Sequence, residues 1–382
     1  MSYILQAAGL VSVSYFVLLS RRRLSLLVLV IPLAWFIGVS LIYWRYGPIG
    51  QWSFYQNDQY FHWRVVDQFL TQDFELTFDR LNFLRVPYTF PAYLLSVLGV
   101  DPTLALKFVS LVCAVTGVHI IDETVRKMSG RVSVGYIWIV AMPITVFFSL
   151  LALRETMMLL CVTHLFLGKS HPIRALSLLV LVILRPHLAA AIVFGLCWGW
   201  LFSRFQDRWY LVSVLATAVL PIYLGTIGFS IGNYIIYKLP IQLYQDLFLQ
   251  DQVVQIFSAF AGLQFLTVAY QTVEYTTRSL LLIRILFPEI VLAPLVFSVS
   301  CFFYTPRTTR LKLSVLATFV FFMAVSSGTE YLSVRQSLPI MPIMGVAAIL
   351  SLSRTFQRGR TEPADLKVTP LSGSPKEFVE QS

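Results

Sequence analysis

The sequence predicts an all-α polytopic membrane protein with about eleven transmembrane helices, and three observations lead to that prediction. The chain is 57% hydrophobic and 13% charged, whereas a soluble domain is about a quarter charged. Its apolar residues come in blocks of roughly 17–24, long enough to cross a hydrocarbon core about 30 Å thick. Half of the short segments between blocks are basic, as the positive-inside rule expects of cytoplasmic loops.

The apolar blocks predict spans at 3–20, 24–44, 103–121, 133–151, 156–168, 175–184, 188–203, 209–229, 286–304, 313–328 and 336–352. The basic connections, placed in the cytoplasm, are 21–23, 126–131, 169–174, 203–208, 306–312 and 354–360. The N-terminus is then outside and the C-terminus inside. This alternation requires the stretch 175–203 to turn around at "LRPH" through two short arms, because a single tilted helix would reverse the later loops. Residues 3–20 could instead be a signal-like segment.

This topology predicts one membrane domain, 1–352, followed by a disordered cytoplasmic tail at 353–382 that is rich in polar residues. Two large extracytoplasmic loops are expected, at 45–102 and 231–284. The first contains "PYTFPAYLLSVLGV" (87–100), which is too short to span comfortably and is typical of an interfacial or re-entrant helix.

Several functional classes find no support in the sequence. It has no GxGxxG, P-loop or HExxH signature and no soluble catalytic domain. The four cysteines all fall inside apolar runs, without metal-ligand spacing or a disulfide pattern. The formal charge of +10 sits at the predicted cytoplasmic ends of spans, so nucleic acid is not an expected partner.

Ionisable side chains are costly in lipid and usually face a cavity or a partner, and four places at the predicted outer face carry them. These are Asp58, His62 and Arg64 after the second span; Arg154 and Glu155; Arg185 and His187 beside Pro186; and Glu330 with Arg335. Taken singly, these places also have explanations that involve no function: a solvated loop for the first, a local ion pair that closes a turn for the second, and an arginine that reaches the membrane surface for the third. Together, they suit a lipid-linked phosphate substrate, because arginine binds phosphate as a bidentate donor and a carboxylate can accept a proton from a hydroxyl.

Four stretches, in this order, resemble the GT-C class of membrane glycosyltransferases, which use polyprenyl- or dolichyl-phosphate-linked sugars. They are "DQYFH" (58–62); "TFPAYLLSVLGVDPTLALKFVSLVCAVTGV"; "GRVSVGYIWIVAMPITVFFSLLALRETMMLLCVTHLFL", with its acid at Glu155; and "VRQSLPIMPIMGVAAIL", with Arg335, Pro339 and Pro342. Two departures concern the site. Many members of the class pair the acid of the first loop with a second acid, whereas the neighbours of Asp58 are Asn57 and Gln59, and Gln336 stands where a tyrosine often follows the arginine.

The resemblance implies a GT-C-like arrangement in which Asp58 is the general base toward an acceptor hydroxyl. Glu155 would support the site or help to hold a divalent metal ion, and metal use stays open. Arg335, with Arg154 or Arg185, would hold the lipid phosphate. His62, Arg64, His187 and Glu330 complete the predicted substrate-binding set. The expected partners are a polyprenyl-phosphate-linked sugar donor, a glycan, lipid or protein acceptor, and membrane lipids. Inverting transfer for cell-envelope polysaccharide or glycoconjugate synthesis favours the bacterial plasma membrane over the endoplasmic reticulum.

Two alternatives remain open at this point. A Wzy-type polysaccharide polymerase or O-antigen ligase would also have many spans, a large outer loop and functional arginines, and would use a diphosphate-linked donor. A lipid or solute transporter would place ionisable groups deep in the membrane, for which Arg185 and His119 are the candidates.

Overall fold

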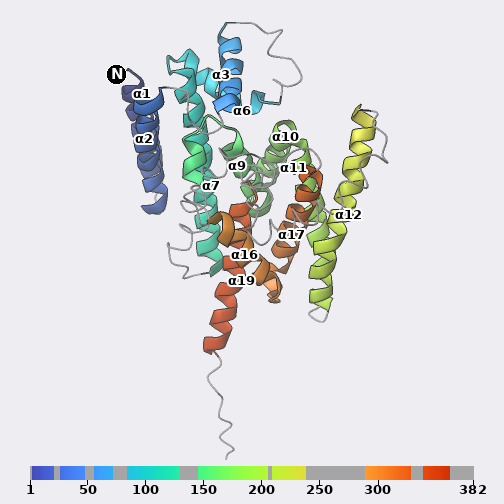
Figure 1. Cartoon of the computed structure of the whole chain (residues 1–382). Coiled ribbons are helices and arrows are strands. Elements are labelled where there is room, and N and C mark those ends of the chain that lie inside the picture. Colours follow the sequence, from blue (N-terminus) through green and yellow to red (C-terminus); the bar gives the residue numbers. More distant parts are fainter. Residues whose placement is uncertain are drawn as a thin grey trace, which may run out of the picture.

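The computed structural model describes residues 2–20, 26–47, 56–71, 84–129, 145–204, 209–237, 289–327 and 339–361, and these ranges hold helices and turns without any strand. The all-α prediction is therefore confirmed for this part of the chain. The helices, arranged as in Figure 1, are α1 (Ser2–Leu19), α2 (Leu26–Tyr46), α3 (Gln56–Leu70), α6 (Val86–Val97), α7 (Pro102–Ser129), α9 (Glu155–Leu167), α10 (His171–Leu184), α11 (Pro186–Phe202), α12 (Tyr210–Tyr237), α16 (Glu289–Cys301), α17 (Pro306–Ser327) and α19 (Met341–Thr361).

Helix α1 packs as part of the bundle. It runs antiparallel to α2, because the Tyr15 hydroxyl donates to the Leu29 carbonyl at 2.7 Å and the rings of Tyr3 and Tyr43 stack with centroids 4.3 Å apart. Its Gln6 side chain donates to one backbone carbonyl and accepts one backbone N–H in the connection that leads into α7, at 3.1 and 3.0 Å. These contacts join α1 to α2 and to the connection that leads into α7.

The stretch 175–203 is not a single helix, because it is interrupted at "LRPH", where the predicted topology requires the chain to turn around. Helix α10 ends at Leu184 and α11 begins at Pro186, while Arg185 between them has non-helical backbone angles of φ −160° and ψ 83°. Helix α11 packs antiparallel to α17: the Arg185 guanidinium lies 5.4 Å from the centre of the Phe322 ring, and Gly199 lies against the Arg310 backbone. Proline has no N–H to donate and its ring fixes φ, so Pro186 suits the first position of a new helix.

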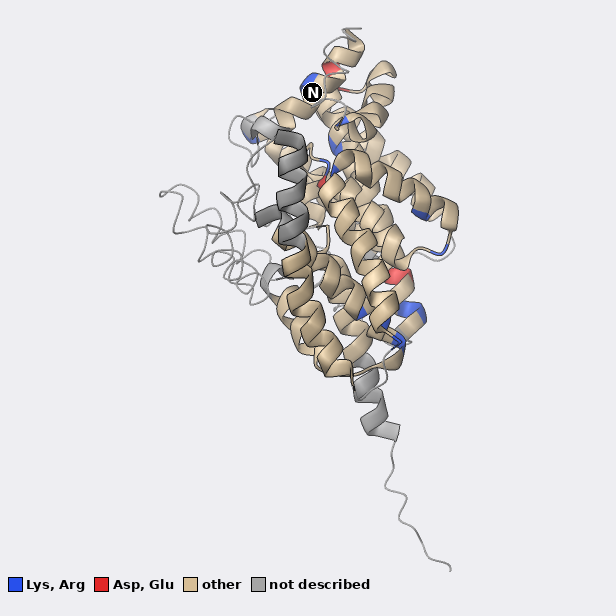
Figure 2. Ribbon diagram, turned by 90° about the vertical axis from the view of Figure 1, so that its right-hand side faces the viewer, with Lys and Arg blue, Asp and Glu red and all other residues tan. Residues whose placement is uncertain are grey.

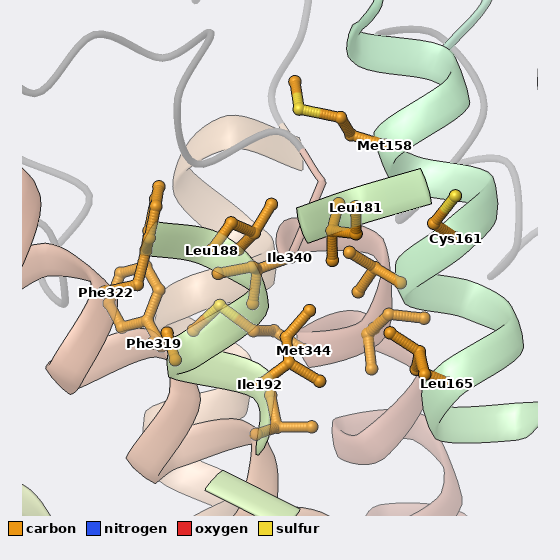
Figure 3. Close-up of a cluster of buried hydrophobic side chains, with 14 of the residues drawn as sticks. Met158, Cys161, Leu165, Leu181, Leu188, Ile192, Phe319, Phe322, Ile340 and Met344 are labelled. Carbon is orange, nitrogen blue, oxygen red and sulfur yellow. The ribbon is translucent and has the colours of Figure 1, made fainter. Parts of the chain in front are cut away.

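Two buried apolar clusters hold the bundle. One contains side chains of α1, α2, α7 and α19. The other joins α9, α10, α11, α16, α17 and α19 with parts of α6 and α7. Figure 3 shows the second cluster, in which Met158 and Leu165 of α9 face Leu181 of α10, Ile192 of α11 and Met344 of α19. Cysteines 113, 161 and 301 are free thiols buried in this cluster, whereas the free thiol of Cys197 is exposed.

The two ends of the bundle differ in composition. Helices α3 and α6 lie at one end, which we call the α3 end, and α19 points away from the other, which we call the α19 end (Figure 1). Figure 2 shows Lys and Arg gathered near the α19 end, around the close of α7 and the start of α17. The last turn of α7 carries two i,i+4 ion pairs there, Arg126 with Asp122 at 2.9 Å and Lys127 with Glu123.

The sides of the bundle expose large apolar residues. Phe16 on α1, Trp44 on α2, Tyr223 on α12 and Phe302, directly after α16, are each more than 60% exposed. Similar residues line the outer faces of α10 and α11. Soluble monomers rarely expose apolar surface on this scale, so these faces are typical of contact with lipid or another protein.

By length and composition, two helices of the described ranges could cross a membrane, Val28–Arg45 and Pro102–Met128. A buried core helix or a signal sequence passes the same test. Seven further apolar helices of 10–17 residues are shorter than that. The predicted count of eleven spans is thus not confirmed, because helices such as α9 and α10 extend only about 20 Å.

Several boundaries differ from the prediction in one direction: helices continue into segments that were predicted as connections. Helix α7 includes the basic residues 126–127, α17 begins at 306 rather than 313, and α12 continues to 237, into the predicted second loop. Helix α19 continues to 361, so residues 353–361 of the predicted disordered tail are helical. Hydropathy marks where an apolar environment ends, whereas Lys, Arg and Glu are good helix formers that extend a helix beyond it.

Candidate functional site

The candidate site is centred on a buried, non-helical turn at 150–154, which separates the short helical stretch 145–149 from α9. Its three central residues, Leu151, Ala152 and Leu153, are at most 1% exposed. A non-helical backbone that is buried away from water needs hydrogen-bond partners from elsewhere in the protein. The bonds that reach this turn therefore identify the elements that hold it.

Side chains from three helices bind the backbone of this turn. From α2, the Trp35 indole N–H donates to the Ser149 carbonyl at 2.9 Å. From α7, the Ser110 hydroxyl lies within hydrogen-bond distance of the carbonyls of Leu151 (3.2 Å) and Leu153 (3.1 Å). From α3, the Gln59 side-chain carbonyl accepts the Ala152 N–H at 3.0 Å. The turn is therefore fixed relative to α2, α3 and α7.

Arg154 and Glu155, the second predicted ionisable pair, follow this turn directly. The Arg154 side chain is partly exposed and donates to the Leu84 carbonyl at 3.3 Å, just before α6. Glu155 is 1% exposed and is the first residue of α9. A carboxylate at that position is stabilised by the positive end of the helix dipole. Glu155 is therefore buried at the start of α9, whereas Arg154 is partly exposed and reaches the backbone just before α6.

His62 and Tyr88 link α3, α6 and α7 beside the turn. His62 is 2% exposed, and its ring meets the Tyr88 ring edge to face with centroids 5.1 Å apart. The Tyr88 hydroxyl donates to the Leu106 carbonyl at 2.9 Å and lies 2.8 Å from Ser110 Oγ. Burial raises the pKa of Tyr88 well above its usual value, so the phenol keeps its proton. His62 thus forms part of the packed wall.

The exposed side of α3 carries aromatic and basic groups. Tyr60 and Phe61 are nearly half exposed, and the Tyr60 ring lies 5.5 Å from that of Trp63. The Arg85 guanidinium lies 5.4 Å from the centre of the Phe61 ring. Arg64, predicted to bind substrate, is exposed on the same helix. Residues 60 and 64 are one turn apart on this helix, and Arg64 is exposed whereas His62 is buried.

The third predicted place is the break between α10 and α11. Arg185 is partly buried over Phe322, as described above, and His187 is exposed in the first turn of α11. Helices α10 and α9 pack together, and α10 also contacts α6, which lies at the α3 end. The break therefore lies at the same end of the bundle as α6.

Three of the predicted site residues fall wholly or partly outside the described part of the chain. Asp58 lies on α3, directly before Gln59, but its side chain is outside the described part of the chain, and so are Glu330 and Arg335 as a whole. Within the described ranges, no three His, Cys, Asp or Glu side chains come together as metal ligands.

Sequence patterns missed two buried lysines and the polar residues that bind the turn. Lys107 is 1% exposed and Lys312 is fully buried, where it donates to the carbonyls of Ser300 and Phe303. Lys107 lies inside a predicted apolar span, and a charged residue in such a span is a feature of the sequence that could have identified it. Both lysines lie within two turns of the start of their helices. Gln59, Ser110 and Trp35 gave no signal, because their partner is the backbone of a distant turn.

Comparison of the chain with protein-family models, with curated proteins and with solved structures gave no match.

Proposed function

We propose that this chain is a multi-pass membrane glycosyltransferase of the GT-C type. It would transfer a sugar from a polyprenyl-phosphate-linked donor to an acceptor hydroxyl at the extracytoplasmic face, in the synthesis of a cell-envelope glycan or glycoconjugate. The observation that carries the proposal is the hydrogen bond from Ala152 to Gln59. It joins the helix that bears Asp58 to the turn that bears Arg154 and Glu155, across 93 residues of sequence.

The surface of the bundle supports the membrane part of this proposal. Exposed aromatic and aliphatic side chains on α1, α2, α10, α12 and α16 would face lipid. The basic ends of α7 and α17 would lie on the cytoplasmic side, and the α3 end on the outer side. Short helices such as α9, whose sides are almost wholly buried, would cross only part of the bilayer inside the bundle.

The chemistry proposed for the α3 end is a single inverting displacement. Asp58 accepts the proton of the acceptor hydroxyl as its oxygen bonds to the anomeric carbon of the sugar. The bond from that carbon to the phosphate oxygen breaks, and its electron pair leaves with the lipid phosphate. Arg335, with Arg154 or Arg185, stabilises the charge of the departing phosphate. Glu155 supports the site from the start of α9.

The proposed function is tested with purified protein, a labelled polyprenyl-monophosphate sugar and the matching diphosphate-linked sugar. We expect transfer from the monophosphate donor, with little from the diphosphate donor. Transfer from the diphosphate donor alone would identify a polymerase or ligase instead. If neither donor is consumed, while the intact protein moves a labelled lipid or solute across vesicles, the transporter alternative holds.

Glu155→Gln is expected to lower the transfer rate by roughly tenfold, because the substitution removes a negative charge while keeping shape and hydrogen-bonding oxygen. The matched control is Glu123→Gln, which neutralises an exposed acid on α7 that pairs with Lys127. That variant should transfer sugar at the wild-type rate. The measurement compares the initial transfer rates of the two variants, and their unfolding midpoints in detergent show whether each is folded. Equal losses in the two variants would contradict a specific role for Glu155.

A further inference from the structure

Gln59 is the residue of α3 that forms a hydrogen bond with the backbone of the buried turn. It is 1% exposed, and the Ala152 N–H that it accepts belongs to a fully buried residue. Residues 150–154 are not helical, so this N–H does not form the bond to the carbonyl four residues earlier that it would form within a helix. Gln59 supplies the acceptor from 93 residues away.

The other bonds to the turn come from different helices and fix it in a different way. Trp35 and Ser110 bind carbonyl oxygens of the turn from α2 and α7, which are long helices of the bundle. Helix α3, in contrast, is a shorter helix at the end of the bundle and is joined to this turn by the Gln59 bond. Loss of that bond would therefore leave the turn in place and leave α3 packed on α6 and α7, but it would remove the hydrogen bond that fixes Gln59 relative to the turn.

The bond also fixes two chemically important positions relative to each other. Asp58 is the residue before Gln59 on α3, and Glu155 is the third residue after Ala152. We propose that Gln59 is a positioning residue for sugar transfer, which holds the helix of the general base at a set distance from Arg154 and Glu155. This inference rests on the proposed function.

The test uses the full-length protein with Gln59→Met, which keeps the length of the side chain but has no strong acceptor, and Gln59→Asn, which keeps the amide but is one methylene shorter. Gln68→Met is the matched control, because Gln68 is a buried glutamine more than two turns further along α3. Hydrogen exchange of peptides that cover 149–154 reports the Ala152 bond without any assay of activity. Transfer kinetics with the labelled polyprenyl-monophosphate sugar report the reaction.

We expect exchange at Ala152 to accelerate by roughly tenfold or more in Gln59→Met, with a smaller change in Gln59→Asn and none in Gln68→Met. The value of kcat should fall in the same order, by roughly tenfold in Gln59→Met, while KM stays within about twofold. Fast exchange with a wild-type kcat would overturn the positioning role and leave the proposed function intact. An equal fall of kcat in Gln68→Met would also overturn it. A wild-type protein that transfers no sugar overturns both proposals, and Gln59→Asn keeps the test decisive if Gln59→Met does not fold.

Discussion

Replacing Asp58 by asparagine is expected to lower the rate of sugar transfer by about 100-fold or more, because the reaction loses its general base. Asparagine is nearly isosteric and cannot accept the proton of the acceptor hydroxyl at neutral pH. The donor should still bind, since the groups proposed to hold its phosphate are arginines. We therefore expect the loss in kcat, with little change in the KM for the donor.

Asp67→Asn provides the control for this prediction. Asp67 lies on the same helix, α3, more than two turns from Asp58, and its side chain is partly exposed. Neutralising it changes the charge of α3 by the same amount without touching the position assigned to the base. Initial rates with a labelled polyprenyl-phosphate sugar separate the two variants. If a folded Asp58→Asn protein transferred sugar as fast as the wild type, Asp58 would not be the base.

Replacing Gly199 by alanine is expected to destabilise the bundle by at least about 2 kcal/mol. A Cβ atom at this position would lie 2.7 Å from the Ser314 backbone nitrogen and 2.8 Å from the Arg310 carbonyl oxygen. These are backbone atoms of α17, so the clash can be relieved only by moving one helix away from the other. A Cβ atom at the neighbouring Gly195 would likewise lie 2.5 Å from the Ser314 carbonyl oxygen. Small residues at four-residue spacing permit such close helix packing in membranes.

Gly117→Ala is the matched control, because a Cβ there would meet only the Leu160 Cα, at an ordinary contact distance of 3.9 Å. Alanine is favoured over glycine within a helix by about 1 kcal/mol, so this variant should be as stable as the wild type or more so. The two variants are compared by their midpoints of thermal unfolding in detergent, with unfolding monitored as the loss of monodisperse protein. A Gly199→Ala protein with an unchanged midpoint would contradict the close packing of α11 and α17.

The sequence allowed the helical class, the break at 185 and the helix at 86–97 to be predicted, since each depends on local patterns. Apolar blocks specify helices, Pro186 ends one helix and starts another, and a 12-residue apolar segment is too short to span. Helix ends were less predictable, because basic residues extend α7 and α17 beyond their apolar cores.

The site could be predicted only in part, for a physical reason. Arg154 and Glu155 stand out in the sequence because charged residues are rare in so apolar a chain. Gln59 and Ser110 act instead through single hydrogen bonds to the backbone of a turn 41 to 93 residues away. Neither the periodicity nor the hydropathy of the sequence indicates which side chain binds which distant backbone group. Lys107 could have been found by the same rule that selected Arg185, since both are cations next to apolar runs.

The buried turn also bears on how the protein is made. Trp35, Gln59, Leu84 and Ser110, which bind residues 149–154, all precede the turn in the sequence. Synthesis proceeds from the N-terminus, so each of these partners has left the ribosome before the turn emerges. The nascent chain can therefore satisfy the polar groups of the turn as soon as it arrives, without waiting for α10 to α19.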